Sequence, residues 1–421
     1  MATSGFSEAL EQATHDNAEV RTAGQRTLQS LAVHELAVDE ILQLLQAVRD
    51  RHRALEPATA RPDDTLIRLL WTDLPALDSD WVTAHIDEFG PDLHPSLIRM
   101  LAHQTAATAQ VALNRLLMRS SIQQTGAAWW PVLLPLTNRR VDPNLVLDGV
   151  LSVLTLDGWS WSAANAVLAW AHDDRLSAPA QRHVAAVAEP FASTLLDRAA
   201  EQIAATTPQQ RRNADDFEQL RGLTGLLLDL LGRLPAVGPG AALRRAAALD
   251  EPWLALWAVR PLAGTPAAVD DAAIARIAAD PETRLPLLSE LSLTDETARV
   301  PAQFRTQAAI AEADMVRWLA YPAELGRAPD DIDLITRTAL DDAGRPADLF
   351  VFKFRTHEPH WAAEKGWMVG TSGPYPQTGS PSLTAGAMTF STFARVDEKP
   401  IDDLVDDIIE TLRSWRESPR S

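Results

Sequence analysis

The chain has 421 residues, of which 46% are hydrophobic and 23% are charged, and this composition is typical of a globular protein with a sizeable core. Its formal net charge of −19 argues against sequence-independent nucleic-acid binding and against an anionic membrane surface, because both attract basic proteins. The lack of cysteine excludes disulfides, thiolate metal sites and cysteine nucleophiles. No apolar run nears the roughly 20 residues of a spanning helix, so we expect a cytoplasmic protein.

Residues 1–300 are predicted to form one helix after another. After Asp16 and Asn17, which can cap a helix, Val20, Leu28 and Leu31 recur at helical spacing within 18–32. The same apolar period marks further segments, including 38–52, 145–156, 178–203, 215–234 and 270–279. Helices of about 10 to 20 residues joined by links with Pro or Gly are typical of antiparallel helix pairs.

A weak internal repetition favours a solenoid for this helical array. The segment from Asp16 resembles a helix of a HEAT repeat. Residues 243–291 hold an Ala/Leu helix, the run Asp250-Glu251-Pro252-Trp253-Leu254, a second helix, and then 274–288 with the run Asp280-Pro281-Glu282-Thr283-Arg284. Units of this size cannot bury their apolar faces alone, so neighbouring units stack. The sequence predicts a HEAT-like α-solenoid over 1–300, with a compact helical bundle as the alternative.

Residues 301–345 are predicted to form a helical connector, with helices at 315–319 and at 332–340. Residues 346–421 are predicted to form a small α+β module. Phe350, Phe352 and Phe354 alternate with Val, Lys and Arg, which is the pattern of a half-buried strand. Further strands are expected at 366–371 and 386–394, and a helix begins near Pro400. About three antiparallel strands with one helix packed across them would result.

Several runs in the C-terminal part of the chain are similar to a known group of proteins. The run 315–331, together with 352–356, 359–363 and 366–370, resembles a group of bacterial HEAT-repeat domain-containing proteins that join a helical array to a C-terminal module. That group has no established enzymatic activity, and HEAT arrays in general bind proteins. The resemblance therefore implies a non-catalytic scaffold or adaptor that binds a protein partner, possibly within a larger complex, and it implies neither a cofactor nor a metal.

Polar and aromatic residues crowd together around the predicted strands. We expect the contacts with a partner to come from Arg317, Glu324, Arg355, His357, His360, Trp361, Trp367 and Tyr375. Trp and Arg are favoured residues at protein interfaces.

The alternative is an enzyme or a small-ligand-binding protein with a site between the solenoid and the C-terminal sheet, around His357 and His360. Together with Glu358 and Arg355, these residues could supply an acid–base pair. The spacing could also ligate a metal, but Pro359 excludes a regular helix, so a packed loop is favoured.

The glycines of 366–373 match no nucleotide-binding motif, and Ser372 is outside a G-x-S-x-G elbow. We expect these glycines to allow close packing or positive φ.

Two further features have open interpretations. The tryptophans at 129, 130, 159 and 161 are predicted to fill the core, with a contact surface as the alternative. In the last helix the acidic residues at 402, 403, 406, 407 and 410 are predicted to form a solvated face, with an acidic docking surface for a basic partner as the alternative.

Overall fold

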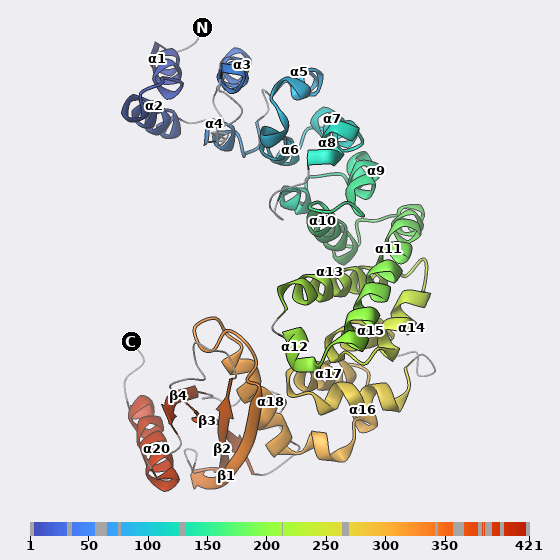
Figure 1. The fold of residues 1–421 in the computed structure, drawn as a ribbon, viewed down its shortest axis with the longest axis vertical. Coiled ribbons are helices and arrows are strands. Elements are labelled where there is room, and N and C mark those ends of the chain that lie inside the picture. The colour runs from blue at the N-terminus through green and yellow to red at the C-terminus, as the bar shows by residue number, and fades with distance from the viewer. Residues whose placement is uncertain are drawn as a thin grey trace. The chain divides into compact units, whose positions relative to one another are not determined.

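The computed structural model describes residues 4–31, 36–54, 65–74, 77–125, 132–212, 214–262, 269–341, 344–356, 366–377, 381, 383, 390–395 and 400–417. As predicted, the chain is mainly helical, with an antiparallel sheet in its C-terminal part (Figure 1). The contacts divide it into two compact units, which are described separately. Unit 1 comprises Met1–Leu195 and Gly222–Ala242, and unit 2 comprises Leu196–Arg221 and Leu243–Ser421.

Unit 1 is built from helices whose apolar faces follow the predicted periodicity. Its helices are α1 (Ser4–Ala13), α2 (Ala18–Ser30), α3 (Val38–Ala54), α4 (Thr65–Leu69), α5 (Ser79–His85), α6 (His94–Ala102), α7 (Ala107–Leu117), α8 (Ser120–Thr125), α9 (Pro143–Val153) and α10 (Ser160–His172), with short 3-10 helices at Ile86–Glu88, Pro91–Leu93 and Leu134–Thr137. Helices close in sequence pack together, α1 on α2 and α7 on α9. Asn17 caps α2 as predicted, accepting the N–H groups of Glu19 and Val20.

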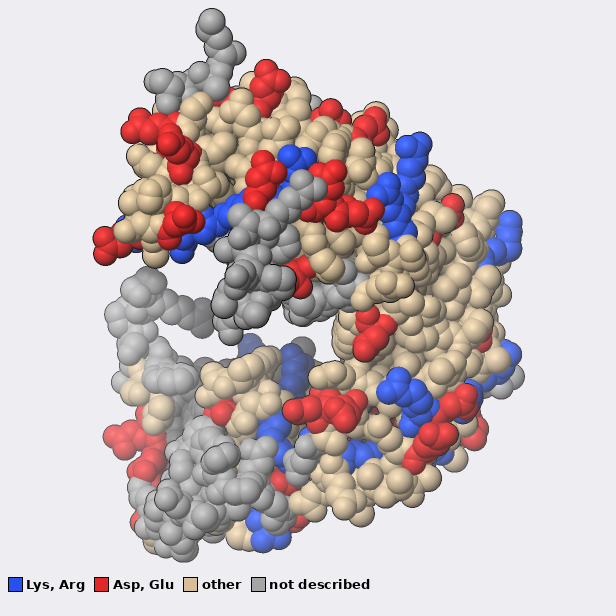
Figure 2. Space-filling view, turned by 45° about the horizontal axis from the view of Figure 1, so that its top comes forward, with Lys and Arg blue, Asp and Glu red and all other residues tan. Residues whose placement is uncertain are grey.

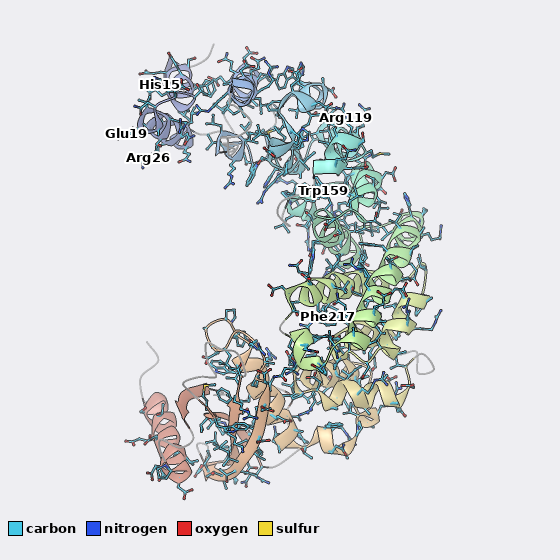
Figure 3. All side chains as sticks on the ribbon, viewed as in Figure 1. His15, Glu19, Arg26, Arg119, Trp159 and Phe217 are labelled. Atoms are coloured by element: carbon cyan, nitrogen blue, oxygen red, sulfur yellow. The ribbon has the colours of Figure 1, made fainter. Side chains whose placement is uncertain are left out.

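Trp159 and Trp161 settle one of the open interpretations for unit 1. Trp159 is fully buried at the start of α10 (Figure 3), as predicted for a core filler. Trp161 is half-buried, and a Cβ on Gly222 would lie 2.8 Å from its indole ring. Both tryptophans therefore pack within the unit, while Trp129 and Trp130 lie outside the described residues.

Unit 2 begins with helices and ends with the sheet and its two covering helices. Its elements are α12 (Pro208–Arg212), α15 (Pro252–Leu262), α16 (Asp271–Ala279), α17 (Pro281–Ser292), short 3-10 helices at Thr297–Arg299 and Ala302–Arg305, α18 (Gln307–Leu319), β1 (Asp331–Asp341), β2 (Pro346–Arg355), β3 (Met368–Pro376), β4 (Phe390–Arg395) and α20 (Ile401–Glu417). Three helices have residues in both units, namely α11 (Ala178–Ala205), α13 (Asp215–Gly232) and α14 (Ala241–Ala248).

The sheet of unit 2 is an antiparallel meander in the order β1-β2-β3-β4. On one face the three Phe side chains of β2 pack against Met315 and Leu319 of α18. On the other face Val351 and Val369 pack with Val405 of α20, which confirms the predicted terminal helix across the sheet. The other covering helix, α18, contains the predicted helical segment 315–319, but its packing on the sheet was not predicted.

The segment 332–340 was predicted to be helical, and this prediction is wrong. It forms most of β1, which pairs with β2 in a register that puts Asp331 opposite Arg355 and Asp333 opposite Lys353. Ile332, Leu334, Thr336 and Thr338 alternate along this segment, and β-branched residues suit a pleated, half-buried surface. The sheet thus has four described strands instead of about three, and the 301–345 connector is not helical throughout.

Candidate functional site

The residues predicted to contact a partner have different surroundings. Arg317 is exposed on α18, and Glu324 is half-buried in the turn that follows this helix. His357, Glu358, Pro359, His360 and Trp361 lie outside the described residues, as does any site built on them.

Arg355 and Trp367 are brought together at one end of the sheet. With Lys353, Asp331 and Asp333 they form what we call the sheet-end cluster. The Trp367 ring lies 4.5 Å from the Lys353 ammonium and 4.6 Å from the Arg355 guanidinium carbon, both within cation–π range. Arg355 Nε is 2.6 Å from Asp331 Oδ2, and Lys353 Nζ is 3.2 Å from Asp333 Oδ2. Each cation is therefore fixed by a carboxylate from β1, and Trp367 remains partly exposed.

Tyr375, another predicted contact residue, lies in the interior. It is 1% exposed and its hydroxyl donates to Asp314 Oδ2 at 3.1 Å. Ser372 Oγ also donates to Asp314 Oδ2 at 3.1 Å and lies 2.7 Å from the Tyr375 hydroxyl. All three side chains are buried, so these hydrogen bonds link β3 to α18 in the interior of unit 2. Tyr375 therefore packs in the core and does not form the predicted surface contact.

The glycines next to this triangle have the predicted structural roles. A Cβ on Gly370 would lie 2.1 Å from the Met315 methyl carbon, and Gly373 has φ +137° with Asp348 O at 2.8 Å from a built Cβ. Close packing and positive φ thus explain two of the glycines.

A second polar site lies in the helical part of unit 2 and was not predicted as a site. We call it the helix-terminus cleft, a cavity of about 190 Å³ next to the N-termini of α15 and α17. It is lined by Pro208, Arg211, Arg212, Phe217, Arg221, Asp250, Glu251, Pro252, Trp253, Asp280 and Glu282. Apolar rings and charged groups therefore share its walls.

The acidic residues of the cleft are positioned by helix capping. Glu251 precedes α15 and accepts the N–H of Leu254 at 2.6 Å, and Asp280 caps α17 by accepting the N–H of Glu282 at 2.8 Å. In both turns a proline occupies the first helical position, where its missing N–H costs nothing. The capping positions hold these carboxylates at the cleft wall.

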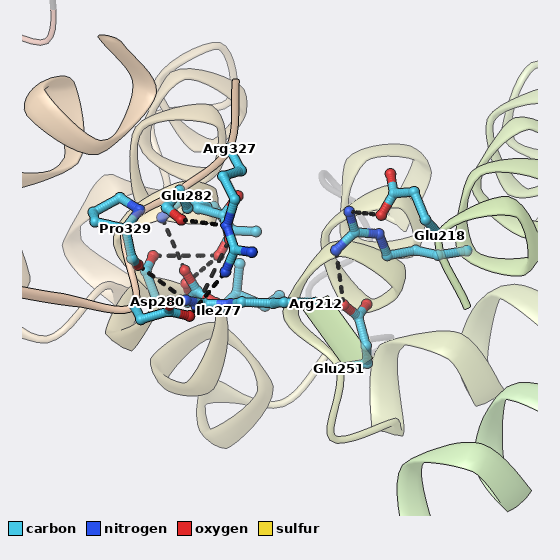
Figure 4. A network of polar contacts seen from close by, with 12 residues as sticks. Arg212, Glu218, Glu251, Ile277, Asp280, Glu282, Arg327 and Pro329 are labelled. Carbon is cyan, nitrogen blue, oxygen red and sulfur yellow. Dashed lines mark hydrogen bonds and ion pairs between the residues drawn. The ribbon is translucent and has the colours of Figure 1, made fainter. Parts of the chain in front are cut away.

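The arginines of the cleft connect it to other parts of unit 2 (Figure 4). Arg212 donates to Pro329 O at 3.2 Å and lies 4.0 Å from Asp280 Oδ2 and 3.8 Å from Glu282 Oε2. Arg221 pairs with Glu218, and its Nη1 is 3.7 Å from Glu251 Oε1. The cleft is thus lined by both positive and negative groups.

Burial and like charge perturb two carboxyl groups of the cleft. Burial raises the pKa of Glu251, and the Asp280 carboxylate adds to the rise while Arg221 and the Leu254 N–H oppose it. Burial also raises the pKa of Glu282, and repulsion from the Asp280 carboxylate raises it further. Arg212 and Arg221 lower this pKa in part. Perturbed carboxyl groups that line a cavity are candidates for a functional role.

A neighbouring cavity of about 250 Å³ shares Arg212, Asp280 and Glu282 with the cleft. Residues 328–332 also line it, and one of them, Asp330, has its Oδ1 2.9 Å from Nη2 of the preceding Arg327. Asp280 and Glu282 therefore border both cavities.

Part of this site had a signal in the sequence. The acidic, proline-containing runs 250–254 and 280–284 belong to the segment whose repetition predicts a solenoid, but nothing in their spacing indicates that they share one cavity with Arg211 and Arg212. The convergence depends on how α12, α15 and α17 pack.

The described surface in Figure 2 carries charges of both signs. On the face in Figure 2, acidic and basic side chains are interspersed. Asp402, Asp403, Asp406, Asp407 and Glu410 on α20 are exposed, as predicted for a solvated face. Among the described residues, no group of three or more His, Asp or Glu side chains is arranged to hold a metal ion, and no helix has the length and apolarity to cross a membrane.

Comparison with known proteins gives no family for this chain. No protein-family model, curated protein or solved structure matches it. Any functional conclusion therefore rests on the residues and their geometry.

Proposed function

We propose that this chain is a non-catalytic, cytoplasmic protein-binding scaffold or adaptor. Its helices are proposed to form HEAT-like repeats, and the packing of sequence neighbours such as α16 on α17 and α17 on α18 supports this. The sheet of unit 2 is proposed to supply a contact for a protein partner. The sheet-end cluster is the observation that carries the proposal.

The composition of the sheet-end cluster suits a protein contact. Trp and Arg are the residues that most often dominate the binding energy of interfaces. Trp367 offers a partly exposed indole, and Arg355 and Lys353 offer charge beside it. Such a group can bury aromatic surface and still donate hydrogen bonds to a partner.

The cluster is also preorganised. The ion pair Arg355–Asp331 and the ion pair Lys353–Asp333 join directly opposed residues of β1 and β2. Since both cations also stack on Trp367, the indole orientation is fixed before a partner arrives. Ordering side chains in advance lowers the entropy cost of association.

A Trp367→Ala substitution tests this proposal. The protein is first used to isolate a partner from the native lysate, and the affinity of the purified partner is then measured by calorimetry. We expect Trp367→Ala to weaken binding at least about tenfold, as removal of an interface hot spot does.

Trp81→Ala is the matched control, because Trp81 is also half-buried and lies 5.9 Å from an arginine, but belongs to unit 1. We expect it to leave the affinity unchanged. A partner that binds wild type and a folded Trp367→Ala protein equally would refute the sheet-end contact.

A further inference from the structure

We propose that the helix-terminus cleft is a binding site for an alkylguanidinium or alkylammonium group, such as an Arg or Lys side chain of a protein or a free amine of similar size. This site is separate from the sheet-end cluster and goes beyond the protein-binding function proposed above. It rests on the unequal engagement of the cleft's cations and carboxylates, on its apolar walls and on its size.

The arginines of the cleft are already engaged. Arg211 donates to the carbonyl oxygens of Ile203 and Thr206 at the end of α11, at 3.2 and 2.6 Å. Arg212 donates to Pro329 O, and Arg221 donates to the Glu218 carboxylate. An anionic ligand would meet four carboxylates in the wall, and their repulsion opposes the attraction of the three arginines and of the two helix N-termini, so an anion site is disfavoured.

The carboxylates are less closely matched by the arginines, although Glu251 and Asp280 each accept one backbone N–H, from Leu254 and Glu282. The ion pairs of Glu251, Glu282 and Asp280 with the arginines are 3.7, 3.8 and 4.0 Å long. Direct N–H to carboxylate hydrogen bonds are about 2.7–2.9 Å, so these pairs attract without close donation. Glu251 and Glu282 have side chains that are 6% and 19% exposed, which makes an added N–H donor worth more there than in water.

The apolar walls and the volume of the cleft limit the uncharged part of the ligand to a short alkyl chain. Phe217 and Trp253 offer rings, and Pro208 and Pro252 offer further apolar surface for the methylene groups of an alkyl chain. The volume of about 190 Å³ is smaller than the roughly 300–1,000 Å³ of pockets for drug-sized ligands. A single basic side chain, or a small diamine, matches this space.

The affinity of the cleft for a cation should depend on whether Glu251 and Glu282 are ionised. Ionised Glu251 and Glu282 are disfavoured by burial, and a bound cation would favour them. Affinity should therefore fall when the pH is lowered through the raised pKa values of these groups, where protons compete with the ligand. The charged groups that face them are Arg211, Arg212, Arg221, Glu218 and Asp280.

Titration calorimetry with agmatine and putrescine tests the proposal. N-butylurea, which is neutral but close in shape to an alkylguanidinium, and inorganic phosphate serve as ligand controls. We expect agmatine to bind at pH 8, with at least tenfold weaker binding at pH 5 and no detectable binding of butylurea or phosphate. No heat from agmatine or putrescine at millimolar concentration, or binding of phosphate instead, would overturn the proposal.

A variant pair locates the site. Glu282→Gln should weaken agmatine binding at least tenfold, because it removes the charge and leaves the backbone N–H that Asp280 accepts. Asp402→Asn, which removes one exposed carboxylate from α20, should leave it unchanged. Equal affinity of wild type and Glu282→Gln would contradict the assignment, and Glu251→Gln provides a second variant should Glu282→Gln fail to fold.

Two peptides separate the possible sources of the cation. An acetylated and amidated Ala-Arg-Ala peptide that binds more tightly than agmatine supports a protein partner, and the reverse order supports a free amine. The matching citrulline peptide should not bind, and its binding with equal affinity would contradict a cation site. Trp367→Ala should retain agmatine binding, so failure of the sheet-end contact and failure of the cleft are distinguishable.

Discussion

At the scale of single residues, glycines decide how closely some helices approach. A Cβ built on Gly149 of α9 would lie 2.7 Å from Asn114 O and 2.9 Å from Asn114 Cα on α7. The Gly149 N–H also donates to Asn114 Oδ1 at 2.6 Å. Because the obstructing atoms include backbone, the two helices would have to separate to admit a side chain.

Gly149→Ala is therefore expected to destabilise the protein by about 1–3 kcal/mol, the usual range for overpacking. Gly5→Ala is the control, because nothing lies within 4 Å of a Cβ built there and Ala suits a helix better than Gly. Calorimetric melting should show a lower Tm for Gly149→Ala and an unchanged or higher Tm for Gly5→Ala. A Tm for Gly149→Ala equal to that of wild type would argue against the close α7–α9 contact.

At the scale of elements, acidic caps position both the helices and the cleft. Asp142, Asp270 and Asp280 each accept a backbone N–H at the start of the next helix. Asp280 has a second effect, because its charge raises the pKa of Glu282. One residue thus starts α17 and adjusts the electrostatics of the cleft.

Substitutions of Asp280 separate the two effects. Asp280→Asn keeps a capping oxygen and should retain most of the stability, whereas Asp280→Ala should lose about 0.5–2 kcal/mol. Both remove the charge, so the pKa of Glu282 should fall in both variants. Thermal melting measures the first effect, and NMR titration of the Glu282 side chain measures the second. A pKa of Glu282 that does not change in Asp280→Asn would exclude the electrostatic coupling.

At the scale of the whole molecule, the excess of acidic groups makes stability depend on pH through many carboxylates at once. Like Glu251, Glu282 has a folded-state pKa that burial raises, so the folded chain holds this proton more tightly than the unfolded chain does. Ionising Glu282 therefore costs free energy in the folded chain. This cost is absent at pH values below the ordinary pKa of a Glu side chain and develops as the pH rises through the raised folded-state pKa. It is then fully present at higher pH.

We expect the Tm of Glu282→Gln, relative to wild type, to rise between pH 4 and pH 8. The other carboxylates titrate in both proteins, so the difference isolates this group. Scanning calorimetry across this range in constant ionic strength provides the measurement. A difference in Tm that stays constant or declines with pH would show that ionised Glu282 is not disfavoured in the folded chain.

Local patterns in the sequence are sufficient to predict several elements of the fold. The helical period fixed α2, α3 and α11, the alternation of Phe350, Phe352 and Phe354 fixed β2, and the amphipathic run after Pro400 fixed α20. Each is an apolar face that burial requires, whichever neighbour supplies the burial. Asn17 as a cap and the glycines of 366–373 were also predictable, because capping and positive φ depend on adjacent residues.

Other features depend on residues far apart in the sequence and are found only in the folded chain. Segment 332–340 is a strand because β2 offers it a pairing edge, and Tyr375 is interior because Asp314 of α18 accepts its hydroxyl. Trp367 meets Arg355 across neighbouring strands, and Glu251 shares a cavity with Glu282 because α15 and α17 pack near α12. Pairing, burial of polar groups and convergence of charges are set by packing between segments, and no local pattern encodes them.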